Sequence, residues 1–236
     1  MSGMVKHSKI LGTLALTMAL GACGSASDEN QSSVLGQLGQ IAGPAVAKVS
    51  GGKSAQPKAA PLSPEQMAAR ALSANPAPLI LVGLENTGTV QVMAMVGDNT
   101  GMRTYMTPNE QALIIRGGML VGTRGLGHDL STAETEGTAV LIRARRAGEG
   151  KRTMRYLDGE GIERPLPMTC SVAIGGGKNF SFAGSSWTAT QVTESCKGGG
   201  AEIQNSYLVT ASGQIPVSRQ WIGPNLDYVS IQTVRP

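Results

Sequence analysis

Hydrophobic and polar residues alternate with a period of two along most of the chain after residue 79, as they do in strands that bury one face. Turn residues interrupt this alternation at short intervals. The clearest alternating runs and the turns between them lie at residues 90–96, 97–99, 158–159, 201–210, 212–213 and 228–233. About ten short strands separated by turns predict an all-β fold, either an antiparallel β-sandwich or a barrel-like sheet. No long helical pattern interleaves with them, which disfavours a parallel α/β sheet.

The Asp158-Gly159 dipeptide lies between two of the predicted strands. Such a pair favours a tight two-residue hairpin turn, because both central residues of that turn take positive φ.

One short helix is expected before the strands, from residue 63 to residue 75. Ser63 suits the N-cap, Pro64 suits the first helical position, and Gln66 can complete a capping box with Ser63. Asn75 followed by Pro76 ends the helix, since the residue before a proline disfavours the helical conformation. The predicted apolar face consists of Met67, Ala68, Ala71 and Leu72.

The first 22 residues have the pattern of a signal peptide. Lys6 and Lys9 precede an apolar stretch at residues 10–20, which is shorter than the roughly 20 residues of a membrane-spanning helix. Leu20-Gly21-Ala22-Cys23 then matches a lipobox, in which the peptidase cleaves before the cysteine and the thiol carries diacylglycerol. Several acyl chains on one residue make anchoring stable. The pattern predicts lipidation of Cys23; the alternative is an ordinary secreted protein in which Cys23 is incidental.

Residues 23–62 are predicted to be the lipidated cysteine and a flexible tether. The segment is rich in Gly, Ser, Ala, Gln, Lys and Pro and has few large apolar residues, a composition typical of disorder. About 39 such residues reach roughly 35 Å. Gly24, and not Asp, follows Cys23, which favours the outer membrane and its periplasmic face. The predicted globular domain covers residues 63–236.

The formal net charge of +4 includes Lys6 and Lys9 of the predicted signal peptide, so the mature chain is close to balanced. This balance argues against nucleic acid as a partner. One basic run is interpreted as a solvated hairpin edge and not as a binding patch. It consists of Arg143, Arg145, Arg146, Lys151, Arg152 and Arg155. Neither Lys53-Ser54 nor Gly177-Lys178 has the glycine spacing of a P-loop, so no nucleotide cofactor is expected.

Cys170 and Cys196 are the remaining cysteines. A pair of cysteines in an exported protein predicts a disulfide, which would join two predicted strands at residues 168–174 and 187–196. The alternative is a metal-binding or redox pair. Two distant thiols and one mature histidine do not make a zinc site, so no metal is expected.

Two motifs stand out, GMLVGTRGLGHDL at residues 118–130 and SRQWIGP at residues 218–224. Together with the lipobox and the YLDG sequence at residues 156–159, they resemble the YjbF/GfcB family, the group 4 capsule polysaccharide lipoproteins, over roughly residues 79–233. The resemblance implies an all-β periplasmic domain and an accessory role in polysaccharide production or export. The long tether departs from the short one expected of the enteric members.

These motifs supply a candidate functional surface, which consists of Arg124, Gly125, Gly127, His128, Asp129, Arg219 and Trp221. His128 and Asp129 could serve a hydrolase triad with Ser131. The structural alternative is a tight Gly-Leu-Gly turn that Arg124 and Asp129 brace as an ion pair. Trp221 could stack on a sugar ring or lie in the core at a strand end.

No catalytic residue is therefore nominated. The leading hypothesis is a non-catalytic accessory in exopolysaccharide or capsule production, anchored to the outer membrane. A saccharide-binding module and a periplasmic glycan hydrolase are the alternatives. Expected partners are the bilayer, through acylated Cys23, and a polysaccharide or other proteins of exopolysaccharide secretion. Because aromatic residues make up only 3% of the chain, a long saccharide groove is disfavoured.

Overall fold

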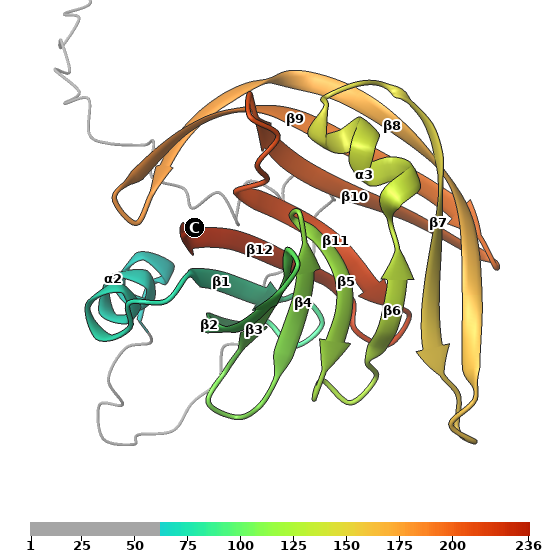
Figure 1. Ribbon diagram of the computed structural model, residues 1–236, viewed down its shortest axis with the longest axis horizontal. Helices are drawn as coiled ribbons and strands as arrows, with labels where there is room; N and C mark the ends of the chain where they lie inside the picture. Colours follow the sequence, from blue (N-terminus) through green and yellow to red (C-terminus); the bar gives the residue numbers. More distant parts are fainter. Residues whose placement is uncertain (1–61) are drawn as a thin grey trace, which may run out of the picture. The chain divides into compact units, whose positions relative to one another are not determined.

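The computed structural model describes residues 62–236, so the predicted signal peptide, Cys23 and nearly all of the predicted tether lie outside the described residues. The described part contains two helices and twelve strands (Figure 1). In chain order the elements are α2 (Pro64–Ala74), β1 (Leu79–Leu84), β2 (Thr89–Asn99), β3 (Met102–Met106), β4 (Ala112–Arg116), β5 (Met119–Arg124), β6 (Leu130–Glu134), α3 (Glu136–Arg143), β7 (Gly148–Leu157), β8 (Glu163–Phe182), β9 (Ser185–Gly198), β10 (Ala201–Thr210), β11 (Val217–Gly223) and β12 (Asp227–Arg235).

All the strands belong to one antiparallel sheet in the order β5-β4-β3-β2-β1-β12-β11-β10-β9-β8-β7-β6. Each strand pairs with its neighbour in sequence, with two exceptions: β1 pairs with β12, and β5 does not pair with β6. The two edge strands are thus consecutive in sequence, and the sheet curls until it is nearly closed (Figure 1). The all-β prediction is confirmed, and the barrel-like form is the one found.

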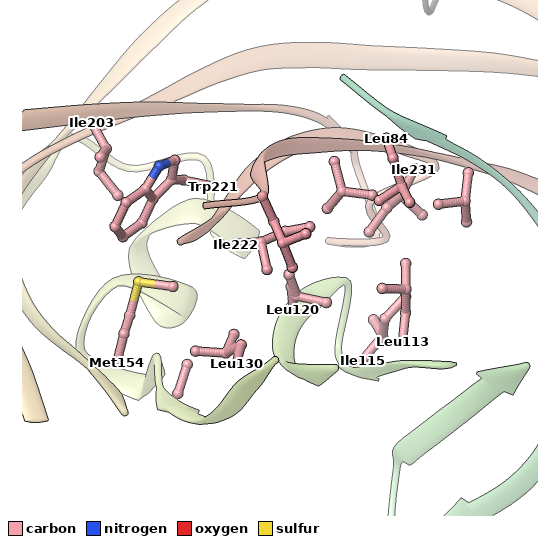
Figure 2. Packing of buried hydrophobic residues seen from close by; sticks show 14 of the residues in the cluster. Leu84, Leu113, Ile115, Leu120, Leu130, Met154, Ile203, Trp221, Ile222 and Ile231 are labelled. Carbon is pink, nitrogen blue, oxygen red and sulfur yellow. The ribbon is translucent and has the colours of Figure 1, made fainter. Parts of the chain in front are cut away.

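The main core fills the inside of this sheet. Figure 2 shows side chains from β1, β4, β5, β6, β7, β10, β11 and β12 that point toward one another. Along β1, Ile80 and Val82 belong to this core, whereas Leu79 and Leu81 belong to a second cluster. Alternate residues of a strand point to opposite faces, so both faces of β1 are covered.

Helix α2 covers the outer face of β1, β2 and β12. The capping box is confirmed: the side-chain oxygen of Ser63 accepts from the Gln66 amide at 3.2 Å, and the side-chain oxygen of Gln66 accepts from the Ser63 amide at 2.9 Å. Asn75 is the C-cap, as predicted. Phe182, at the tip of the β8–β9 hairpin, reaches the same cluster. The hairpin therefore arches across the sheet toward α2 (Figure 1).

Helix α3 was not predicted. It has only eight residues, and Thr135 makes no side-chain capping hydrogen bond. It lies close to β7 because glycines face each other there: a Cβ built on Gly150 would come within 2.5 Å of the Gly137 carbonyl oxygen. One turn further along the helix, Leu141 and Ile142 join a cluster with residues of β8, β9 and β10. Tertiary packing, and not a local sequence signal, stabilises this helix.

The turn between β7 and β8 is longer than the predicted two-residue turn. The Asp158 amide donates to the Ile162 carbonyl, and Asp158 Oδ1 accepts from the amides of Glu160 and Ile162. Gly161, and not Gly159, has positive φ. The aspartate side chain therefore organises a wider loop, as aspartate commonly does in turns.

Candidate functional site

The Gly-Leu-Gly turn between β5 and β6 is organised by Asp129. Its Oδ2 accepts from the Gly125 amide at 2.9 Å, and its Oδ1 accepts from the Leu126 amide at 3.2 Å and the Thr123 hydroxyl at 2.8 Å. The predicted ion pair between Arg124 and Asp129 is wrong, because no such bridge occurs among the described residues. Asp129 braces the turn through neutral donors.

Arg124 and Thr123 instead join the two edges of the sheet. Arg124 donates from Nη1 to the carbonyls of Leu130 and Ser131 at 3.4 and 3.3 Å, and the Leu130 amide donates to the Thr123 hydroxyl at 2.9 Å. On Gly122, a Cβ would lie 3.4 Å from the Ser131 carbonyl oxygen. Side chains therefore replace the missing β5–β6 ladder, and the first motif closes the barrel.

His128 and Ser131 do not form the catalytic arrangement that the sequence left open. His128 is exposed, and its side chain makes no hydrogen bond within the described part of the chain. The Ser131 hydroxyl donates to Glu163 Oε1 at 2.9 Å. Since Asp129 is also engaged in the turn, none of the three contacts another as a nucleophile–base–acid triad requires.

The second motif lies in the fold and not on an exposed surface. Arg219 makes a bidentate contact with Glu85, at 2.7 Å from both Nε and Nη2, and its guanidinium lies 3.4 Å from the centroid of the Tyr228 ring. Trp221 is only 6% exposed and packs edge-on against Tyr156, with ring centroids 6.5 Å apart. The core alternative for Trp221 is the one found (Figure 2).

Gln220 belongs to the second motif but was not among the candidate residues, and it connects the two motifs inside the barrel. Its Oε1 accepts from the Leu120 amide at 2.8 Å, and its Nε2 donates to the Gly118 carbonyl at 2.9 Å. The motifs thus meet across the interior, and most of their polar atoms stabilise the fold.

A second polar group in the interior is centred on Glu194. Its Oε2 accepts from Arg152 Nη1 at 3.0 Å and from Asn205 and Tyr207 at 2.8 Å each. Neither charged side chain has exposed surface. Burial opposes the charged form of Glu194, but Arg152 and neutral side chains, Thr138 as well as Asn205 and Tyr207, outweigh it and lower the pKa of this carboxyl below its ordinary value.

The prediction that the basic run is a solvated hairpin edge is therefore wrong for Arg152. The run begins at the end of α3 and continues into β7, where Arg152 faces inward together with Met154. Alternate residues of β7 point into the barrel and out of it. The sequence of the basic run alone does not reveal which set points inward.

The predicted disulfide is confirmed. Cys170 on β8 and Cys196 on β9 are directly opposite each other, and the two sulfurs are bonded. In the described residues these cysteines and Glu194 form the only cluster of three potential metal ligands, whose donor atoms lie within 4.8 Å of one another. Because the disulfide consumes both thiols and Arg152 occupies the carboxylate, this cluster does not offer a metal site.

An open cleft of about 490 Å³ lies at one end of the barrel. The β2–β3, β4–β5 and β10–β11 turns surround it, together with the beginning of β1 and the end of β12. Its charged side chains are those of Arg103, Arg116, Arg143 and Asp98, the last residue, Pro236, also lines it, and Trp187 contributes the largest aromatic wall. The volume is within the roughly 300–1,000 Å³ of small-molecule sites. Of the lining arginines, only Arg143 lay in the basic run.

Comparisons with known proteins agree with this architecture. A family model described as group 4 capsule polysaccharide lipoprotein GfcB, YjbF matches residues 52–234. The crystal structure of the hypothetical lipoprotein YmcC from Escherichia coli (K12) has a TM-score of 0.63 and 19% identity, and the match covers 72% of this chain and 90% of that chain. At this identity the likeness shows the fold alone. No curated protein matches the sequence.

Proposed function

Since the chain belongs to the YjbF family of group 4 capsule polysaccharide lipoproteins, we propose that it is a non-catalytic accessory in the production or export of capsule or exopolysaccharide. The family match over residues 52–234 is the observation that carries this proposal. The deletion of the gene should then lower surface polysaccharide, and the full chain should restore it. Normal polysaccharide in a clean deletion strain would reject the accessory role.

The environment of His128, the only histidine after the predicted signal peptide, supports the non-catalytic part of the proposal. His128 is exposed and Asp129 is occupied by the turn, while Ser131 contacts Glu163. The complementing gene carrying His128→Ala should therefore restore polysaccharide fully. Asp129→Ala is the matched variant. Because Asp129 stabilises the turn, this variant should lower polysaccharide only by lowering the amount of folded protein, which distinguishes a structural effect from a catalytic one. Lost polysaccharide at normal levels of folded His128→Ala protein would support a hydrolase instead.

The proposal places the domain at the periplasmic face of the outer membrane, held by acyl chains on Cys23. The lipobox supports the anchor, and no helix within residues 62–236 is long and apolar enough to cross a bilayer. Cys23→Ala should shift the protein out of the membrane fraction or leave it uncleaved. Gly24→Asp should keep the lipid but move the protein to the inner membrane in an enteric host. A cleaved Cys23→Ala protein that stays with the membrane would contradict the anchor.

Saccharide binding is the second candidate function, and the cleft favours it. The cleft is recessed, has an aromatic wall and is surrounded by turns, where ligand-binding residues commonly lie. Of the two motifs, whose polar atoms largely stabilise the fold, only the first residues, Gly118 and Ser218, line it.

A further inference from the structure

We propose that the cleft at the open end of the barrel binds an acidic saccharide, with Arg103, Arg116 and Arg143 recognising its carboxylates. This inference rests on the proposed role in polysaccharide production, for which it names the substrate class and the site.

Three separate elements bring the arginines together. Arg103 lies on β3, Arg116 at the end of β4, and Arg143 at the end of α3. All three line the same cleft, whereas Asp98 is its only acidic side chain. The lining side chains therefore carry a surplus of positive charge. Recessed surfaces of one charge sign concentrate ligands of the opposite sign.

Much of the hydrogen-bonding capacity of these arginines is not used by the protein. Arg103 meets Asp98 through Nε at 3.1 Å, and Arg143 donates through Nε to the Gly213 carbonyl at 3.3 Å. Arg116 is half exposed, and its nearest carboxylate oxygen, on Glu136, is 3.9 Å away. A guanidinium has five N–H donors arranged to fit a carboxylate bidentately. Arg103 and Arg143 make these contacts through Nε, and the terminal nitrogens of Arg116 have only long contacts, to Glu136 and, at 4.0 Å, to Met102 Sδ, so terminal N–H groups of all three remain available for a ligand.

The uncharged part of the lining suits a sugar ring better than a lone anion. Ile80, Ile231 and Pro216 are apolar, and Trp187 adds an aromatic surface. The indole nitrogen of Trp187 is buried without a partner among the described residues. Gln214 and Thr233 add polar groups. A mainly apolar wall with a few polar groups is typical of small-molecule sites.

The shape of the site also favours a saccharide over a membrane surface. Anionic lipid headgroups are attracted to basic segments that lie at the bilayer surface. Here the arginines surround a hollow of about 490 Å³ and two of them reach it from a strand and a helix end. A chain with carboxylates at intervals can enter such a hollow, whereas a flat layer of headgroups contacts only its rim.

The experiment uses the full chain in micelles of a neutral detergent, titrated with trigalacturonic acid and with its uncharged methyl ester. Of the two tryptophans, Trp187 lines the cleft and Trp221 is in the core, so tryptophan fluorescence reports on the site. We expect the acid to bind about tenfold more tightly than the ester, since hydrogen bonds to charged groups are stronger than neutral ones. Added salt should weaken the binding of the acid.

The variants identify the site. Arg116→Gln with Arg143→Gln should weaken the binding of trigalacturonic acid about tenfold or more, because each substitution removes a charge-assisted contact. Arg164→Gln is the matched control, since Arg164 is exposed, is paired with Asp158 and lies outside the cleft. If the double variant does not fold, Arg116→Gln alone, at an exposed turn, provides the test with a smaller expected loss.

Three results would overturn the inference: equal binding of acid and ester, unchanged binding in the arginine variant, or preferential binding to vesicles that contain anionic lipid. Each is independent of the accessory role. Absent binding together with lost polysaccharide in the deletion strain rejects only the site. Retained binding together with normal polysaccharide rejects only the accessory role.

Discussion

Replacing Arg152 by methionine should lower the free energy of unfolding by about 3–5 kcal/mol. Arg152 and Glu194 have no exposed side-chain surface, and their charged atoms are 3.0 Å apart. Without the guanidinium, Glu194 keeps only Asn205 and Tyr207 as donors to Oε2. The removal of one partner from a buried ion pair costs about 3–5 kcal/mol, because the remaining charge is left uncompensated. Since domains unfold with about 5–15 kcal/mol, this loss is a large fraction of the total.

The dependence of this loss on pH has a definite sign. Although burial opposes ionisation, Arg152 helps to lower the pKa of Glu194 in the folded protein. The ionised carboxylate therefore adds stability above its unfolded pKa, and this stability is lost as the pH falls through the lower folded pKa. In Arg152→Met, burial acts without the opposing charge and raises the pKa of Glu194. The stability difference between the variant and the unsubstituted protein should consequently shrink on acidification.

Chemical denaturation followed by tryptophan fluorescence measures both effects. Arg164→Met is the control, because an exposed pair such as Arg164 and Asp158 contributes little to stability. The double variant Arg152→Met with Glu194→Leu should lose less than Arg152→Met alone, since apolar residues can replace a buried pair at little cost. If Arg152→Met costs no more than Arg164→Met, or if the double variant loses the sum of the single effects, the uncompensated-charge explanation is wrong.

Three further changes should lower the free energy of unfolding by predictable amounts. Replacing both Cys170 and Cys196 by alanine should cost about 3–4 kcal/mol, because a bond across a separation of 26 residues restricts the unfolded chain; a loss below about 1 kcal/mol in denaturant titrations would contradict this. Asp129→Ala should cost about 1–3 kcal/mol, because it leaves amides of the turn unpaired. It should also speed hydrogen exchange of the Leu130 amide, where β5 meets β6; unchanged exchange would disprove a role of Asp129 in closing the barrel. Ser63→Ala should cost about 1 kcal/mol through the lost cap, and Ser63→Asp should retain most of that stability; equal losses in the two variants would show that the cap is unimportant.

Local chemistry explains which parts of the fold the sequence could predict. The strand at Ala201–Thr210 begins and ends at the predicted residues, and turn residues bound it. The capping box at Ser63 needs only residues within one helical turn. The disulfide could be predicted because the two cysteines lie in adjacent predicted strands, which are joined by a hairpin. Each of these features depends on short-range patterns, or on one covalent bond between neighbours.

Features that depend on the closed sheet could not be predicted in this way. Helix α3 exists because Gly137 and Gly150 let it approach β7, which is a tertiary contact. Arg152 is in the set of alternate β7 residues that points inward, and its partner Glu194 is on β9, two strands away in the sheet. The ion pair predicted between Arg124 and Asp129 failed for a similar reason: the carbonyls of β6 were closer partners for Arg124 once the two edges met.

The closure of the barrel also explains what most polar atoms of the two noticeable motifs do. A meander whose edge strands are consecutive in sequence must join those edges over a short turn, and unpaired edge groups are costly when buried. Thr123, Arg124 and Asp129 satisfy that requirement at the turn, and Gln220 does so from across the interior. Residues that must close the barrel in this way form recognisable motifs, but their polar atoms are then used in hydrogen bonds within the protein. Residues that bind a ligand need free donors, and the arginines of the cleft lie on β3, at the end of β4 and at the end of α3, which share no sequence pattern.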